Sequence, residues 1–296
     1  MTPPLLRALD RWLFAPVPRE RLALLRLAIG GYAWIYLLAR ARDLLAPAQF
    51  PASAFAPLGI VSLLDAPLPA AALYAVYGLS VLSGALFVLG AAYRSVAPVF
   101  ALCLLWVLSY RHSWGMIFHT DNLLVLHVSL LALAPAADAY AYPRRAAGGD
   151  SLHNGWVVRA LCLVTCAAYV VAGVAKLELS GIRWAGGSAL REQIAYDALR
   201  KIELGSVHSP LGPWLLPHRW LFAPLSVFSL AAELLAPLAL LGGRWAASWC
   251  LGAWLFHLGV LATMAIVFPY PLSGVAFLAF FPLERWFARA TRRTSG

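Results

Sequence analysis

Charged side chains are scarce in this sequence. They make up 12% of the 296 residues, whereas hydrophobic residues make up 62%. This composition excludes a soluble protein with a polar shell and is typical of a polytopic membrane protein. Acidic residues are scarcer than basic ones, with 13 Asp and Glu against 23 Lys and Arg. The arginines form short clusters between apolar runs, which fits topology signals and anionic lipid headgroups and argues against a nucleic-acid partner.

Cysteine motifs and internal repeats are also lacking. The four cysteines lie inside apolar runs and no Cys-x-x-Cys occurs, so we expect small core residues and no metal site. The absence of repeated halves counts against a small-molecule transporter, which stays an alternative.

Long apolar runs predict an all-α, polytopic helical bundle with about eight membrane spans, in a single integral-membrane domain over residues 1–296. The last run is short and follows Pro269 and Pro271, so it fits a tilted or partly inserted segment. The predicted spans are residues 21–39, 70–91, 95–110, 120–135, 156–176, 221–241, 245–267 and 270–283.

The arginine clusters predict the orientation. Placing both termini in the cytoplasm puts most arginines on the inner side of a cell membrane under eight spans. Two outer connections are then long, residues 42–69 and 177–220. Within the second, residues 189–202 predict a helix with Leu190, Ile194, Leu199 and Ile202 on one stripe. This helix is either interfacial or packed on the bundle.

Titratable groups inside spans are unexpected, because each costs about 2.5–3.5 kcal/mol on insertion scales. The orientation brings three of them, from three helices, into the outer half of the bundle: His119, Lys176 and His257. With the neutral amide of Asn122 added, the polar residues of the spans are His119, Asp121, Asn122, His127, Lys176, Glu233 and His257.

Each of these groups also has a plain structural interpretation. Lys176 ends an apolar run, where a lysine often extends its ammonium to the headgroups. The histidines could simply hydrogen-bond a neighbouring helix, and Asp121 and Asn122 could cap the fourth span. Glu233 fits a protonated carboxyl or a partner for Lys176 or an arginine.

The sequence around Lys176 resembles the membrane part of the vitamin K-dependent gamma-carboxylases and the wider horizontally transferred transmembrane (HTTM) domain family. The shared pattern is Ala172-Gly173-x-x-Lys176-Leu177, followed by Trp184 and then Gly187.

Further matches extend over most of the chain. They are Phe256-His257 with the aromatic stretch after it, a weaker match at His119, and Arg26 inside the first span. We expect a short, bacterial-type member without the large lumenal domain of the animal enzymes.

The resemblance implies an enzyme. In the carboxylases a lysine deprotonates a reduced quinone, which reacts with oxygen to give a strong base and an epoxide. That base removes a proton from a peptide glutamate, and the carbanion captures carbon dioxide. Here the cofactor would be vitamin K hydroquinone or menaquinol, without a metal. Lys176 would be the base, assisted by His257 and His119.

The resemblance also implies residues that bind the quinone, namely Trp184, Gly187, Phe256, Asp121 and Asn122. The chain departs from the animal enzymes in two places, with Ala175 where they have a first lysine and Phe118 where they have asparagine. The acceptor is therefore open: a peptide or protein glutamate, or another molecule at the outer face. A non-catalytic helper for maturation, export or immunity of a partner protein is the main alternative.

Overall fold

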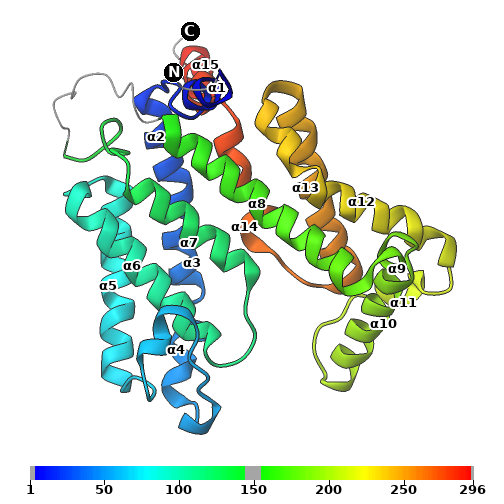
Figure 1. Cartoon of the computed structure of the whole chain (residues 1–296). Helices are drawn as coiled ribbons and strands as arrows, with labels where there is room; N and C mark the ends of the chain where they lie inside the picture. The colour runs from blue at the N-terminus through cyan, green and yellow to red at the C-terminus, as the bar shows by residue number, and fades with distance from the viewer. Residues whose placement is uncertain (1–3, 144–154, 295–296) are drawn as a thin grey trace. The chain divides into compact units, whose positions relative to one another are not determined.

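The computed structural model describes residues 4–143 and 155–294, and within these ranges every regular element is a helix (Figure 1). The predicted all-α class is confirmed. The chain divides into two compact units, residues 1–161 with 282–296 and residues 162–281, and each is described by itself. The prediction of a single domain over 1–296 stays a prediction.

The first unit contains the N-terminal helices and the last one. Helix α8 begins in it and continues into the second unit. The helices are α1 (Pro4–Leu13), α2 (Arg19–Leu25), α3 (Gly31–Ala39), α4 (Ala41–Leu45), α5 (Ala70–Leu89), α6 (Tyr93–His112), α7 (His119–Ala132), α8 (Gly155–Ser180) and α15 (Leu283–Thr294).

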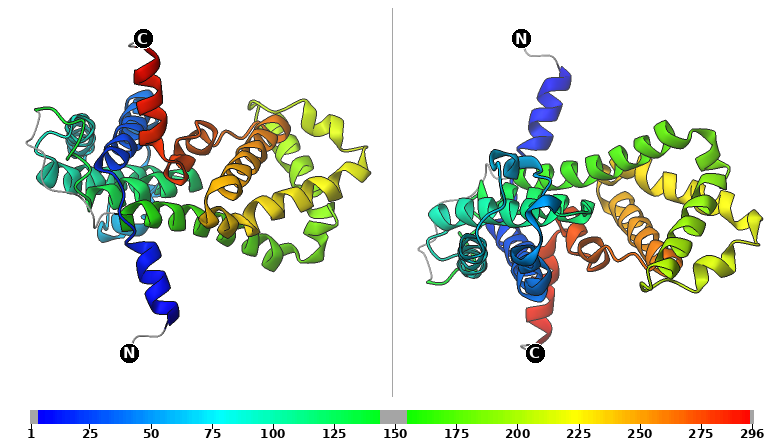
Figure 2. Two further views of the ribbon diagram at one scale, coloured as in Figure 1. Left: turned by 90° about the horizontal axis from the view of Figure 1, so that it is seen from above. Right: turned by 90° about the horizontal axis from the view of Figure 1, so that it is seen from below.

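The second unit surrounds the C-terminal part of α8. Its other helices are α9 (Ile182–Ala185), α10 (Ser188–Glu203), α11 (Leu211–Leu215), α12 (Phe222–Leu234), α13 (Gly243–Met264) and α14 (Pro269–Leu272). Helices α10, α11 and α12 pack on α13, and Figure 2 shows α12 and α13 side by side.

Five stretches of the described chain are long and apolar enough to cross a membrane. The first joins α2, a five-residue π-helix (Arg26–Gly30) and α3 into one continuous helical rod. These five correspond to five of the eight predicted spans. They are Arg19–Ala39, Ala70–Leu89, Tyr93–His112, Gly155–Ser180 and Gly243–Met264.

The other three predicted spans are shorter or interrupted. Helix α7 has 14 residues and so extends about 21 Å, less than the roughly 30 Å hydrocarbon core. The run 221–241 changes from α12 to a 3₁₀ helix (Ala236–Leu241) that has a proline in its first turn. In 270–283, Gly274 at a φ of 77° ends α14, and a 3₁₀ helix (Val275–Phe280) follows.

Two close contacts organise the first unit. Gly84 lies where a Cβ atom would come 2.8 Å from the ring of Phe100 and 3.0 Å from Trp34, so a glycine is needed for α5 to approach its neighbours. Arg26 is fully buried in the π-helix and donates from Nη2 to the Tyr140 carbonyl at 2.6 Å. A π-helix is rare and is often found at a functional site.

The predicted helix at 189–202 is confirmed as α10, but only half of its predicted apolar stripe, Leu190 and Ile194, packs inward. Leu199 and Ile202 are more than half exposed, whereas Asp197 is buried. The reason is that Lys201 binds Asp197 at 2.9 Å and also donates to the Met264 carbonyl, so a charged edge packs on α13. Helix α10 packs on α11, α12 and α13. This agrees with one of the two interpretations, a helix packed on the bundle.

Candidate functional site

Lys176 and Glu233 form an ion pair inside the second unit. Lys176 lies on the last turns of α8, and its Nζ donates to Oε1 of Glu233 on α12. The Glu233 side chain is 4% exposed and the Lys176 side chain 21% exposed. Neither charge is fully hydrated at this depth, so each is stabilised by the opposite charge of its partner. Of the alternatives for Glu233, the structure therefore shows the partner of Lys176.

Gly173 explains how the two helices come close enough for this pair. A Cβ atom at Gly173 would lie 2.8 Å from Cδ2 of Leu234 and 3.0 Å from Cβ of Glu233. Gly173 precedes Lys176 by three residues and so lies on the same face of α8. The glycine of the Ala-Gly-x-x-Lys pattern thus permits the contact that the lysine then makes.

Two aromatic rings enclose the ammonium. Lys176 Nζ lies 5.0 Å from the ring centre of Trp184 on α9, and also 5.0 Å from that of Phe256 on α13. Trp184 is held by a hydrogen bond from Nε1 to Ser229 Oγ at 3.1 Å. Contacts of this kind favour a cation over a neutral amine.

His257 follows Phe256 on α13 and is buried. Its Nε2 lies 2.7 Å from the Tyr169 hydroxyl, and its ring centre lies 4.9 Å from that of Phe268. Tyr169 is two helical turns before Lys176 on α8, so both residues lie on the same side of that helix. The Tyr169–His257 pair and the Lys176–Glu233 pair are therefore supplied by the same three helices.

Each of these two pairs leaves one buried polar atom without a partner among the described residues. These atoms are Glu233 Oε2 and His257 Nδ1. Buried polar groups are normally hydrogen-bonded, so these two exceptions beside one cation make this a candidate site for a polar ligand. We call Lys176, Glu233, Tyr169, His257, Trp184 and Phe256 the lysine site.

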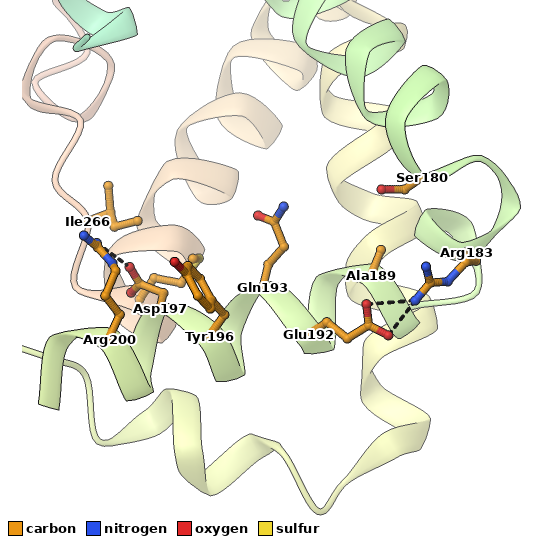
Figure 3. Close-up of a pocket in the computed structure, with 10 residues that line it drawn as sticks. Ser180, Arg183, Ala189, Glu192, Gln193, Tyr196, Asp197, Arg200 and Ile266 are labelled. Atoms are coloured by element: carbon orange, nitrogen blue, oxygen red, sulfur yellow. Dashed lines mark hydrogen bonds and ion pairs between the residues drawn. The ribbon is translucent and has the colours of Figure 1, made fainter. Parts of the chain in front are cut away.

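A polar pocket of about 610 Å³ begins one helical turn beyond Lys176. Figure 3 shows its side chains along α10, with the Arg183–Glu192 pair toward one end and the Arg200–Asp197 pair toward the other. Ser180, Ala189, Gln193, Tyr196, Met264 and Ile266 complete the lining. Its charged residues contribute two positive and two negative groups, so it suits a polar molecule better than an acyl chain.

A second polar cluster lies in the first unit. Asp121 on α7 is buried. Its Oδ1 accepts a hydrogen bond from the Tyr36 hydroxyl at 2.9 Å, and its Oδ2 lies at hydrogen-bond distance, 3.1 Å, from His112 Nε2. Both of its carboxylate oxygens thus have partners. The helix begins without a side-chain cap, so Asp121 joins three helices and does not cap α7. We call Tyr36, His112 and Asp121 the aspartate cluster.

The predicted site residues fall into both units. Lys176, His257, Trp184 and Phe256 meet in the lysine site. Gly187, at a φ of 86°, packs its Cα against the backbone of Phe222 and Ala223, where a side chain would not fit. Its role is to turn the chain into α10.

In the first unit, Asn122 is exposed and His127 is buried on α7. His119 begins α7, and its side chain lies outside the described part of the chain. Its predicted role, and the quinone-binding roles of Asp121 and Asn122, stay predictions.

Sequence reasoning missed Tyr169, Ser229, Tyr36 and His112. Tyr169 could have been found, since it lies seven residues before Lys176 and so shares its helix face. The other three are brought into place by helix packing that no local pattern reveals.

The comparison with protein families covers nearly the whole chain. The model of the HTTM domain matches residues 14–286. No curated protein and no solved structure matches the chain. The chain therefore belongs to the HTTM domain family, and it is a membrane protein related to the gamma-carboxylases.

Proposed function

We propose that this protein is a membrane enzyme that uses a reduced quinone and oxygen to modify a polar acceptor. The observation that carries the proposal is the lysine site, where a buried ion pair lies between aromatic rings beside two unpartnered polar atoms. The relation to the gamma-carboxylases supports the same reaction class.

The residues of the lysine site fit the chemistry of a reduced quinone. A quinone is a flat ring with oxygens on opposite edges, and Trp184, Phe256 and Phe268 offer flat apolar surfaces. Glu233 Oε2 and His257 Nδ1 are free to exchange hydrogen bonds with its oxygens. When bound, a reduced quinone would supply two electrons and, with oxygen, a strong base.

The residues of the lysine site would act at the first step, before the reduced quinone reacts with oxygen. The Lys176–Glu233 pair would remove the hydroxyl proton and stabilise the charge left behind. Tyr169 would hold the ring of His257 in one orientation, so that Nδ1 faces the ligand. Burial would limit the access of water, which would otherwise consume a strongly basic species.

We place the acceptor in the polar pocket along α10. Its mixed charges support a peptide or another polar group. Carboxylation of a glutamate, with carbon dioxide as the second substrate, is the reaction that the family relation favours. The proposal keeps the arginine-based orientation, with both termini in the cytoplasm and the lysine site in the outer half of a cell membrane.

The test uses the purified protein in lipid nanodiscs, supplied with a reduced naphthoquinone. We expect saturable quinol binding, oxygen uptake and formation of quinone epoxide. Lys176→Ala should lower turnover by about 10²–10⁴-fold, because it removes one member of the proton-accepting pair. Glu178→Gln is the matched control, since Glu178 is an exposed carboxylate two residues further along α8.

Failure of the wild-type protein to bind the quinol, in the presence of its natural partner, would exclude this function. A non-catalytic helper role would then be favoured, because a helper has no need for a quinone.

A further inference from the structure

We propose that helices α1 and α15 together bind the headgroups of anionic phospholipids, at the end of the first unit where both chain termini lie. We call α1 and α15 the terminal helices. Their lipid partner is separate from the quinone of the proposed function, and the surface that binds it lies in the other unit from the lysine site.

Both terminal helices are attached close to the ends of membrane spans. Glu284 joins α15 to α2, because its carboxylate accepts from Arg21 Nε at 2.9 Å and from Arg21 Nη2 at 2.6 Å. On α1, the ring centre of Trp12 lies 5.0 Å from the guanidinium carbon of Arg159. Arg21 and Arg159 are each within the first five residues of a membrane-spanning stretch. The terminal helices are therefore held at the level where these spans leave the hydrocarbon core.

The terminal helices lie across this end of the first unit. Figure 1 shows both of them at the end that carries the N- and C-termini, and Figure 2 shows them extending to opposite sides. They have 10 and 12 residues, whereas a helix that crosses a bilayer needs about 20. Short helices in this position run along a membrane surface when one side of the helix is apolar.

Helix α1 has such an apolar side and a basic one. Leu6, Leu9 and Leu13 recur at helical spacing on one face, and Leu6 and Leu9 are 54% and 51% exposed. Arg7 and Arg11 are one turn apart on another face, and both are exposed. At a membrane surface the leucines would be buried below the headgroups while the arginines reach the phosphates.

Helix α15 repeats the arrangement with aromatic residues. Trp286 and Phe287 are 48% and 46% exposed, and tryptophan is enriched at membrane–water interfaces. Arg285 is exposed as well, and the sequence of this helix contains three further arginines. The single acidic residue of α15, Glu284, is already paired with Arg21.

The charge of the terminal helices favours anionic over zwitterionic lipids. Their sequences contain six arginines and two acidic residues. Each basic residue near an anionic leaflet adds an attraction that salt screens beyond a Debye length of about 8–10 Å. A zwitterionic surface would accept the apolar sides but would gain little from the arginines. Charge complementarity therefore identifies the partner as an anionic lipid surface.

The first experiment measures hydrogen–deuterium exchange of the full-length protein in nanodiscs. The nanodiscs contain either phosphatidylcholine alone or a mixture of phosphatidylcholine and phosphatidylglycerol. We expect the backbone amides of α1 and α15 to exchange about tenfold more slowly in the anionic nanodiscs and to lose this protection at high salt. Helix α10 of the second unit is the internal reference and should exchange equally in both.

The second experiment changes the charge of α1 and leaves its leucines in place. Arg7→Gln combined with Arg11→Gln should remove most of the extra protection of α1 in anionic nanodiscs, by about fivefold for each arginine. Asp10→Asn should increase the protection, because it removes a negative charge from the same helix. Arg244→Gln is the control, since Arg244 is an exposed arginine of the other unit. All these variants should unfold at the wild-type temperature in phosphatidylcholine, because the altered side chains are exposed.

Three results would overturn the proposal. Slow exchange of the terminal helices in both kinds of nanodisc, insensitive to salt, would mean that their apolar sides insert without recognition of charge. Fast exchange in both would mean that the terminal helices are away from the lipid and that a protein partner or a second copy covers them. Full protection of the double arginine variant in anionic nanodiscs would show that the arginines do not bind the headgroups.

Discussion

The aspartate cluster of the first unit and the lysine site of the second use the same kind of group in different ways. Each centres on a buried carboxylate that is contacted by another helix. Both oxygens of Asp121 have partners, whereas one oxygen of Glu233 has none. A satisfied carboxylate joins helices, and an unsatisfied one keeps capacity for a ligand. The comparison distinguishes a buried charge with both oxygens partnered from one that keeps a free acceptor atom.

The largest expected effect comes from exchanging each carboxylate for its amide. Glu233→Gln should lower turnover by about 10²–10⁴-fold and cost only about 1 kcal/mol of stability, because Lys176 is partly exposed and can move its charge outward. Quinol-dependent oxygen uptake and thermal unfolding in detergent measure the two quantities.

Asp121→Asn should have the opposite effect, with a large loss of stability and little loss of turnover. It weakens two buried hydrogen bonds to a carboxylate, each worth about 1.5–3 kcal/mol, so we expect clear destabilisation. Protein that survives should keep near-normal turnover at a permissive temperature. A stable Asp121→Asn protein without activity would place Asp121 in the functional site and break the comparison.

Gly173→Ala tests the contact that creates the lysine site. The added methyl group would lie 3.0 Å from Cβ of Glu233, so α8 and α12 must separate. Overpacking of this kind costs about 1–3 kcal/mol. Turnover should fall as well, because the Lys176–Glu233 contact lengthens. Gly252→Ala on α13 is the control, since nothing lies within 4 Å of the added atom there.

Tyr169→Phe should have a smaller effect. It removes the hydrogen bond to His257 Nε2 and keeps the ring. The net value of such a bond is about 1 kcal/mol, which corresponds to roughly a fivefold loss of turnover. If His257 is oriented by Tyr169, the loss should come with weaker quinol binding. A variant with unchanged affinity and turnover would show that packing alone orients His257.

The smallest effect concerns acid stability in the first unit. Burial tends to raise the pKa of Glu284, but hydrogen bonds and charge from Arg21 outweigh it, and the pKa lies below its usual 4.5. Glu284 therefore stabilises the folded state above that value, and the contribution is lost as pH falls through the lowered pKa. Glu284→Gln should flatten this part of the stability curve. Glu20→Gln, at a more exposed ion pair, should leave it unchanged.

Much of the fold was predictable because a membrane imposes simple rules. Long apolar runs predict helices, since lipid offers no partners for unpaired backbone groups. Three of the eight runs proved short or interrupted for local reasons, such as Gly274 and the proline after Ala236. Half of the stripe predicted for α10, Leu199 and Ile202, is exposed, because Lys201 reaches Asp197 and the Met264 carbonyl and a charged edge packs on α13 there.

The sequence by itself determined the membrane class and the family resemblance, and it predicted Lys176 and His257 as site residues. These follow from hydropathy and from short motifs that are local in the chain. Only the tertiary structure decided which partners those residues have. Glu233 is 57 residues from Lys176, and Tyr169 is 88 residues from His257. Contacts over such separations depend on how helices pack, and here that depends on Gly173, whose missing side chain lets α8 and α12 meet.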